Sequence, residues 1–154
     1  MKIITNKGIA TLPTIMIIGM IALALVVSIT AISFNELLIS QGSAQSTSAL
    51  FYAESGARDA LLKIARDKNY SCITPDCYSI DFVENGCVNN TNCAKVTVSN
   101  DPGTTENPKI IVSKGVMKAS IRTIQVSVIL DGGSTDPSLQ NGEITSSSWS
   151  ELTE

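Results

Sequence analysis

The chain contains 154 residues, which is enough for one membrane helix and one small globular domain. Its 11 basic and 14 acidic residues give a net charge of −3, so the whole chain has no general attraction to nucleic acid. Histidine is absent, which excludes the Ser-His-Asp and Cys-His arrangements of nucleophilic enzymes. We therefore expect a protein that is not an enzyme and uses no cofactor.

An uncharged apolar run covers residues 9–34. An apolar stretch of roughly 20 residues crosses a bilayer as a helix, and this run is longer than that. It also exceeds the apolar core of an ordinary signal peptide, and no small-x-small cleavage site ends it. Lys2 and Lys7 precede the run, and short basic flanks stay in the cytoplasm. The pattern predicts a single-pass protein of the cytoplasmic membrane, with its C-terminal domain outside.

A helical pattern continues beyond the membrane stretch, over residues 35–68. The apolar positions follow helical spacing and form one stripe: Leu50, Ala53, Ala57, Ala60, Leu61 and Ile64. Glu54 and Arg58 are four residues apart in the order that favours an ion pair, as are Asp59 and Lys63. A continuous helix over residues 9–67 would be about 90 Å long. Because a small domain needs far less, such a helix must find partners along its length.

All four cysteines fall within the loop-rich residues 69–93: Cys72, Cys77, Cys87 and Cys93. An even number of cysteines in an oxidising compartment predicts disulfides, with three possible connectivities. Four thiolates can also bind zinc, but the usual C-x2-C spacing and histidine ligands are missing. We therefore favour two disulfides over a metal site, and their pairing stays open.

After residue 93 the pattern changes to β-branched alternation, over residues 94–99, 109–114 and 120–130. Gly115 falls in a predicted short hairpin connection, and the tail around Trp149 is expected to add a short edge strand. In the last long strand a mainly apolar set is expected to face the helix: Arg122, Ile124, Val126, Val128 and Leu130. The sequence predicts an antiparallel sheet packed on the helix stripe, which is an α+β fold.

Three further sets of residues give weaker indications of catalysis, calcium binding or helix packing. Asp81 and Glu84 lie in a loop, where carboxylates are generally solvated rather than catalytic. Asp131, Asp136 and Asn141 offer oxygen ligands for calcium, but their spacing does not match the EF-hand loop. Four small helix residues either let a neighbouring helix approach closely or are merely low-cost helix positions: Gly42, Ala44, Ser48 and Ala49.

The N-terminal sequence resembles the class III signal of type IV pilins, because Lys7-Gly8 precedes a charge-free helix. The resemblance implies that prepilin peptidase cuts after Gly8 and that Ile9 becomes the mature, methylated amino terminus. Residues 1–8 would then be the leader, residues 9–34 the transmembrane and assembly helix, and residues 35–68 its amphipathic continuation. Residues 69–154 would form an extracytoplasmic, disulfide-bearing β domain.

Three further segments resemble PilX-type minor pilins. Residues 51–56 (FYAESG) look like the A-E-(A/S)-G segment of these proteins. Residues 114–126 are similar to their S-x-G…R-T-(V/I)-x-V strand pair. Residues 148–152 (SWSEL) look like their S-W-x-E end. The resemblance implies a pilin-like fold, in which Glu36 and Glu54 act in assembly. It also implies other pilin subunits, prepilin peptidase and the lipid bilayer as partners, and a pilus or the cell surface as the final location.

One position departs from the family pattern. Major pilins carry a glutamate as the fifth residue of the mature chain, whereas this chain has Pro13 at that place. Proline is tolerated in the first turn of a helix, which fits a helix start at residues 10–12. The missing carboxylate favours a minor pilin or pseudopilin at or near a filament tip over a major subunit.

Two other hypotheses stay open. An adhesive or DNA-binding tip module would use the cysteine region and a set of basic side chains, although strand alternation would scatter them: Lys95, Lys109, Lys114, Lys118 and Arg122. Alternatively, the chain is a single-pass membrane protein that is neither processed nor assembled. None of these hypotheses includes a small-molecule substrate.

Overall fold

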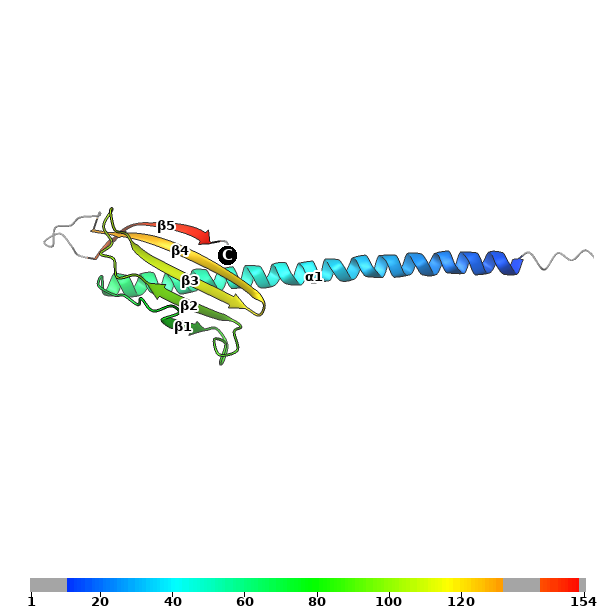
Figure 1. The fold of residues 1–154 in the computed structure, drawn as a ribbon, viewed down its shortest axis with the longest axis horizontal. Coiled ribbons are helices and arrows are strands. Elements are labelled where there is room, and N and C mark those ends of the chain that lie inside the picture. The colour runs from blue at the N-terminus through cyan, green and yellow to red at the C-terminus, as the bar shows by residue number, and fades with distance from the viewer. Residues whose placement is uncertain (1–10, 132–141, 153–154) are drawn as a thin grey trace, which may run out of the picture. The chain divides into compact units, whose positions relative to one another are not determined.

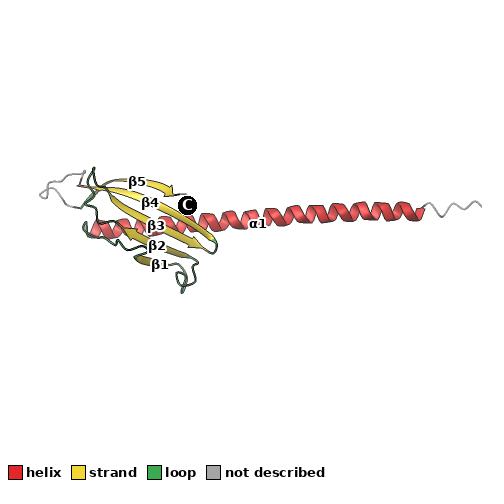
Figure 2. Cartoon of the chain, viewed as in Figure 1, coloured by secondary structure: helices red, strands yellow, loops and turns green. Residues whose placement is uncertain are grey.

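The computed structural model describes residues 11–131 and 142–152. One helix, α1 (Thr11–Arg66), precedes five strands: β1 (Tyr78–Asp81), β2 (Cys93–Val98), β3 (Lys109–Met117), β4 (Ser120–Leu130) and β5 (Ile144–Leu152), as Figure 1 and Figure 2 show. The chain forms two compact units, Met1–Gln41 and Gly42–Glu154, and α1 contributes to both. One long helix followed by an antiparallel sheet confirms the predicted α+β class.

In the first unit, all described side chains of α1 are exposed. By length and composition, the helix is long and apolar enough to cross a membrane. Its hydroxyl groups donate hydrogen bonds to carbonyl oxygens one turn earlier, as Ser28 does to Ala24 and Thr30 does to Val26, each over 2.8 Å. Polar side chains that are satisfied within their own helix add little cost in apolar surroundings.

The local sequence accounts for both ends of α1. Pro13 lies in the first turn of the described helix, where its missing amide proton loses no helical hydrogen bond. Lys63 and Arg66 occupy the last turn, where cations complement the helix dipole. Just beyond it, the Asp67 carboxylate accepts a hydrogen bond from the amide of Asn69 and turns the chain away. The predicted continuous helix is thus confirmed over Thr11–Arg66.

The sheet of the second unit has the strand order β1-β2-β3-β4-β5, and every neighbouring pair is antiparallel. The second half of α1 covers one face of this sheet (Figure 1). The alternation of the strands directs one apolar set to this face. Together with the helix stripe it forms the core: Ala53, Ala57, Ala60, Ile64, Val96, Val98, Ile111, Ile124, Val126, Val128 and Leu130. The helix-facing set predicted for β4 is confirmed from Ile124 onward.

The connection between β3 and β4 differs from the prediction. Gly115 lies inside β3, and the turn falls at Lys118 and Ala119, where Lys118 adopts a positive φ of 54°. The prediction treated the glycine as a turn signal, whereas its backbone is extended. The glycine serves a different purpose, which is close packing against α1.

Two other strands differ from the prediction. β1 lies within residues 69–93, which the sequence indicated as loops, and its four residues are too few to show a clear alternation. β5 has nine residues instead of forming a short strand around Trp149. Its run of serines has low strand propensity, so the pairing with β4 decides its length.

Candidate functional site

Small residues let α1 approach the sheet closely. Ala49, Ala53 and Gly56 are buried on the face of the helix that meets the strands. A Cβ added to Gly56 would lie 3.0 Å from the Cβ of Ala94 and would overlap the hydroxyl of Ser113. Residues 51–56, one of the segments that resemble minor pilins, therefore contain a packing contact in which only glycine fits.

Gly115 makes the matching contact from the sheet. A Cβ at this position would overlap the carbonyl oxygen of Ala49 and lie 2.5 Å from the amide nitrogen of Ala53. No side chain fits between this point of β3 and the helix backbone. Gly56 and Gly115 come from two different segments of the resemblance, and both lie at the same helix–sheet interface.

The third segment, residues 148–152, lies in β5 and reaches the same interface. Oε1 of Glu151 forms a 2.9 Å ion pair with Nη1 of Arg122 in β4. Nε of Arg122 also donates a 2.9 Å hydrogen bond to Oγ of Ser46 in α1. A partly exposed ion pair contributes about 0.2–1 kcal/mol, so this contact fixes the position of β5 more than it stabilises the fold.

Trp149 of β5 also faces the helix. Its ring centroid lies 5.8 Å from the guanidinium carbon of Arg58, a cation–π contact. The predicted partner of Arg58 was Glu54, but no ion pair of Glu54 occurs among the described residues. The other predicted pair does form, with 3.1 Å between Lys63 Nζ and Asp59 Oδ2.

Two hollows lie between α1 and β5, and we call them together the α1–β5 seam. The first is lined by Leu50, Glu54, Ile124, Trp149, Ser150 and Glu151. The second is lined by Arg58, Leu61, Leu62, Ala65 and Ile144. The carboxylates of Glu54 and Glu151 therefore border the first hollow, beside the apolar surface of Leu50, Ile124 and Trp149.

At the other edge of the sheet, Lys63 ties the end of α1 to β1. Its Nζ lies 3.3 Å from the ring centroid of Tyr78 and 5.8 Å from that of Tyr70. The ammonium group is thus held between aromatic rings and the carboxylate of Asp59. Burial, together with the negative charge of Asp59, raises the pKa of the Tyr78 phenol far above its ordinary value.

The four cysteines form two disulfides between sequence neighbours, Cys72–Cys77 and Cys87–Cys93. This confirms the disulfide prediction and selects one of the three connectivities that the sequence allowed. The zinc alternative is wrong for these residues, because none of the four is a free thiol. Each bond closes a short loop, and the two loops flank β1.

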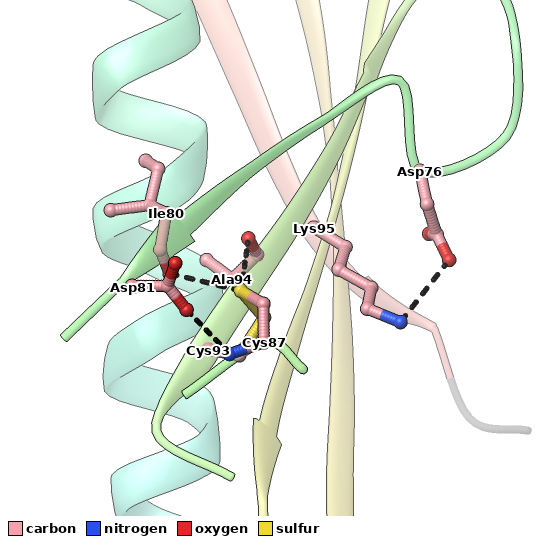
Figure 3. Close-up of a disulfide and its surroundings, with 7 residues drawn as sticks. All are labelled: Asp76, Ile80, Asp81, Cys87, Cys93, Ala94 and Lys95. Atoms are coloured by element: carbon pink, nitrogen blue, oxygen red, sulfur yellow. Dashed lines mark hydrogen bonds and ion pairs between the residues drawn. A yellow bond between two sulfur atoms is a disulfide. The ribbon is translucent and has the colours of Figure 1, made fainter. Parts of the chain in front are cut away.

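Figure 3 shows how the second disulfide loop is held. The amide of Cys87 donates a hydrogen bond to the carboxylate of Asp81, so this carboxylate orders the loop. On α1, the ring of Tyr52 stacks on Phe82, with 4.4 Å between centroids, and its hydroxyl accepts a 2.8 Å hydrogen bond from Asn92. The segment that leads into the loop, at Phe82, and the end of the loop, at Asn92, are therefore both held against the helix.

One member of the predicted basic patch is buried. The side chain of Lys109 is only 2% exposed, and its Nζ donates hydrogen bonds to the carbonyl oxygens of Tyr70, over 3.0 Å, and Ser99, over 3.4 Å. Burial lowers the pKa of this ammonium group. Lys109 is thus a core residue, and its prediction as a surface cation was wrong.

The other basic residues are scattered, as strand alternation predicted. Lys95 and Lys114 are cross-strand neighbours, and Lys95 forms a 3.7 Å ion pair with Asp76, which Figure 3 shows. Lys118 lies in the turn before β4 and Arg122 points to the helix side. The five basic side chains of the predicted patch therefore do not form one continuous surface, because Lys109 is buried and Arg122 points to the helix side.

The remaining predicted residues are as follows. Gly8, Ile9, Asp136 and Asn141 lie outside the described residues. Pro13 and Glu36 are exposed on the first part of α1, and Glu84 is exposed in the turn between β1 and Cys87. The carboxylate of Asp131 accepts hydrogen bonds from the amides of Gly142, over 2.6 Å, and Glu143, over 3.1 Å, so it links the end of β4 to the residues just before β5.

Sequence reasoning placed Gly56 and Glu151 in resembling segments, and it also predicted Gly115 in a hairpin connection and Trp149 in an edge strand, but it predicted none of their contacts. The spacing between them along the chain gives no sign that they meet, because the contacts depend on strand register. Comparison with protein-family models, with curated proteins and with solved structures finds no match to this chain.

Proposed function

We propose that this chain is a structural minor subunit of a type IV pilus or a related secretion filament, without catalytic activity. The observation that supports the proposal most is the division of α1 into two parts with different surfaces. The first part exposes apolar side chains in all directions, and the second part buries a stripe of small residues against the sheet. A helix that is apolar all round requires lipid or protein around it.

The proposed mechanism is transfer of α1 between two apolar surroundings. The helix anchors the chain in the cytoplasmic membrane after prepilin peptidase has cut behind Gly8, and it then packs among the helices of other subunits. Because apolar surface stays out of water in both states, the transfer costs little hydrophobic free energy. The hydroxyls of Ser28 and Thr30 are satisfied within the helix and add no further cost.

Glu36 marks the outer limit of the membrane segment in this proposal. At 1.5 Å per residue it lies about 35 Å along the helix from Pro13, which exceeds a hydrocarbon core of about 30 Å. The charged carboxylate therefore reaches the polar side of the bilayer. The disulfides fit an oxidising compartment beyond it.

The test asks whether the chain enters filaments only when prepilin peptidase can cleave it behind Gly8. The full chain is expressed with its prepilin peptidase, filaments are sheared from the cells, and the chain is detected in the filament and membrane fractions. We expect wild type and Gly42→Ala in both fractions and Gly8→Val in the membrane only. If the wild-type chain never leaves the membrane fraction, the alternative of an unprocessed single-pass protein is supported instead.

A further inference from the structure

β5 is an open edge of the described sheet. Residues 146–152 pair with β4 on one side, and no described strand lies on their other side. Such an edge presents a row of backbone N–H and C=O groups that suits another extended chain. Natural edges are usually protected by lysine, proline or a bulge, yet these residues contain neither lysine nor proline, and the register shift lies at the Ile144 end. The single charged residue, Glu151, is paired with Arg122 inside the domain.

The α1–β5 seam would receive the side chains of an added strand. Alternate side chains of such a strand point to the helix side, where the two hollows lie. Leu50, Ile124 and Trp149 offer apolar surface in the first hollow, and Trp149 keeps 40% of its surface exposed. Glu54 and Glu151 add two carboxylates there, and Glu151 is paired with Arg122. Arg58 lines the second hollow and contacts the Trp149 ring, and no ion pair of Glu54 occurs among the described residues.

We propose that the α1–β5 seam is a docking site for an extended segment of another protein, which adds a strand beside β5 and places a lysine or arginine against Glu54. The backbone edge supplies hydrogen bonds, and the hollows supply selectivity for alternate side chains. The carboxylate beside an apolar surface selects a cationic side chain, because an opposite charge is favoured there and a like charge is repelled.

A second copy of this chain is a poor occupant of the seam. The two described edge strands that it could offer are β1 (YSID) and β5 (ITSSSWSEL), and neither contains a lysine or an arginine. β1 also has only four residues and ends in Asp81, which adds negative charge. The Glu54 carboxylate of the first hollow, which has no ion pair among the described residues, therefore points to a different partner segment that carries a cationic side chain there. This inference does not depend on cleavage behind Gly8 or on filament membership.

The test uses the full chain in detergent micelles and synthetic peptides as probes. Trp149 is the only tryptophan of the chain, so its fluorescence reports directly on the seam. The probe is a peptide of the length of β5 in which valine and threonine alternate around one central lysine. We expect saturable binding, about tenfold weaker binding when glutamate replaces the lysine, and no binding when alternate backbone nitrogens are methylated.

Matched charge variants complete the test. Glu54→Lys should reverse the preference, so that the glutamate peptide binds more tightly than the lysine peptide. Glu84→Lys makes the same charge change on an exposed loop and should leave both affinities unchanged. If Glu54→Lys alters the melting curve, Glu54→Gln replaces it and should abolish the discrimination between the two peptides.

Several results would overturn the proposal. One is that the lysine peptide shows no saturable binding. Another is that the methylated peptide binds as tightly as the unmethylated lysine peptide. A third is that both Glu54 variants still prefer the lysine peptide over the glutamate peptide as strongly as the wild-type chain does. Self-association of the wild-type chain that a lysine introduced at Ser148 abolishes would also overturn it, because the occupant would then be a second copy.

Discussion

Gly115 of β3 lies against the backbone of α1 at Ala49, so closely that a Cβ on Gly115 would overlap the Ala49 carbonyl oxygen. Gly115 is not among the glycines with positive φ, so space rather than backbone conformation requires a glycine there. The contact places the middle of the sheet directly on the helix. Among the described glycines, Gly115 is the one where an added Cβ would come nearest to a neighbouring atom.

Replacing Gly115 with alanine should therefore destabilise the second unit strongly. Overpacking costs about 1–3 kcal/mol, and we expect the upper end of this range because the added Cβ would meet helix backbone rather than a side chain that can move. Chemical denaturation of the full chain in detergent, followed by circular dichroism, measures the change. Gly42→Ala is the control, since a Cβ there meets nothing within 4 Å, and we expect a gain of about 0.5–1 kcal/mol from helix propensity. Equal midpoints for wild type and Gly115→Ala would contradict the packing account.

Ser113→Ala should stabilise the protein. The Ser113 hydroxyl is buried and has no hydrogen-bond partner among the described residues, which costs about 1–3 kcal/mol of desolvation. Removing it also creates space for a methyl group at position 56, so Gly56→Ala should cost less in the Ser113→Ala background than alone. A double-mutant cycle of unfolding free energies checks this coupling. Strict additivity, or a loss of stability in Ser113→Ala, would refute it.

The two disulfides should contribute unequally. Closing loops of this size stabilises a fold by about 2 kcal/mol each through the entropy of the unfolded chain. Cys93 is completely buried in β2, whereas Cys77 is exposed, so alanine at Cys87 and Cys93 also leaves a core gap. We expect the Cys87→Ala/Cys93→Ala variant to unfold at a lower denaturant concentration than Cys72→Ala/Cys77→Ala. Non-reducing peptide mapping should recover only Cys72–Cys77 and Cys87–Cys93, and peptides that cross-link the two loops would contradict the pairing.

Tyr78 should make the protein less stable in alkali. Burial and Asp59 raise the pKa of the folded phenol above the value of 10.0 that it has when unfolded. Above pH 10 the unfolded chain releases this proton while the folded chain keeps it, so stability falls as pH rises; below pH 10 both states hold the proton and the effect vanishes. Urea unfolding between about pH 8 and 11 should show a smaller alkaline loss for Tyr78→Phe than for wild type. The lowered pKa of Lys109 affects both chains alike and cancels in the difference. Parallel pH profiles for the two chains would count against this account.

The sequence was sufficient for the main elements because their signals are local. An uncharged run and a stripe that includes Ala53, Ala57 and Ile64 predict the helix, and β-branched alternation predicts β2, β3 and β4. The predicted ion pair of Asp59 with Lys63 also formed, since its spacing is set by the helix alone.

The predictions that failed depend on contacts between distant segments. Gly115 looked like a turn residue, because only the position of α1 above β3 shows that space is limiting. Lys109 looked like a surface cation, because its carbonyl partners at Tyr70 and Ser99 come from other parts of the chain. Arg58 pairs with Trp149 rather than Glu54, because the register of β5 places the ring within reach. None of these contacts produces a repeating pattern of residues that can be recognised in the sequence.

The amino terminus of the membrane-bound protein tests the proposed function most directly. The full-length gene product is isolated from cells that contain prepilin peptidase, and its intact mass and N-terminal peptide are measured by mass spectrometry. The account predicts a mature chain that lacks residues 1–8 and begins with Ile9, with or without a methyl group on its amine. A protein that retains Met1 and the residues up to Gly8 would contradict it.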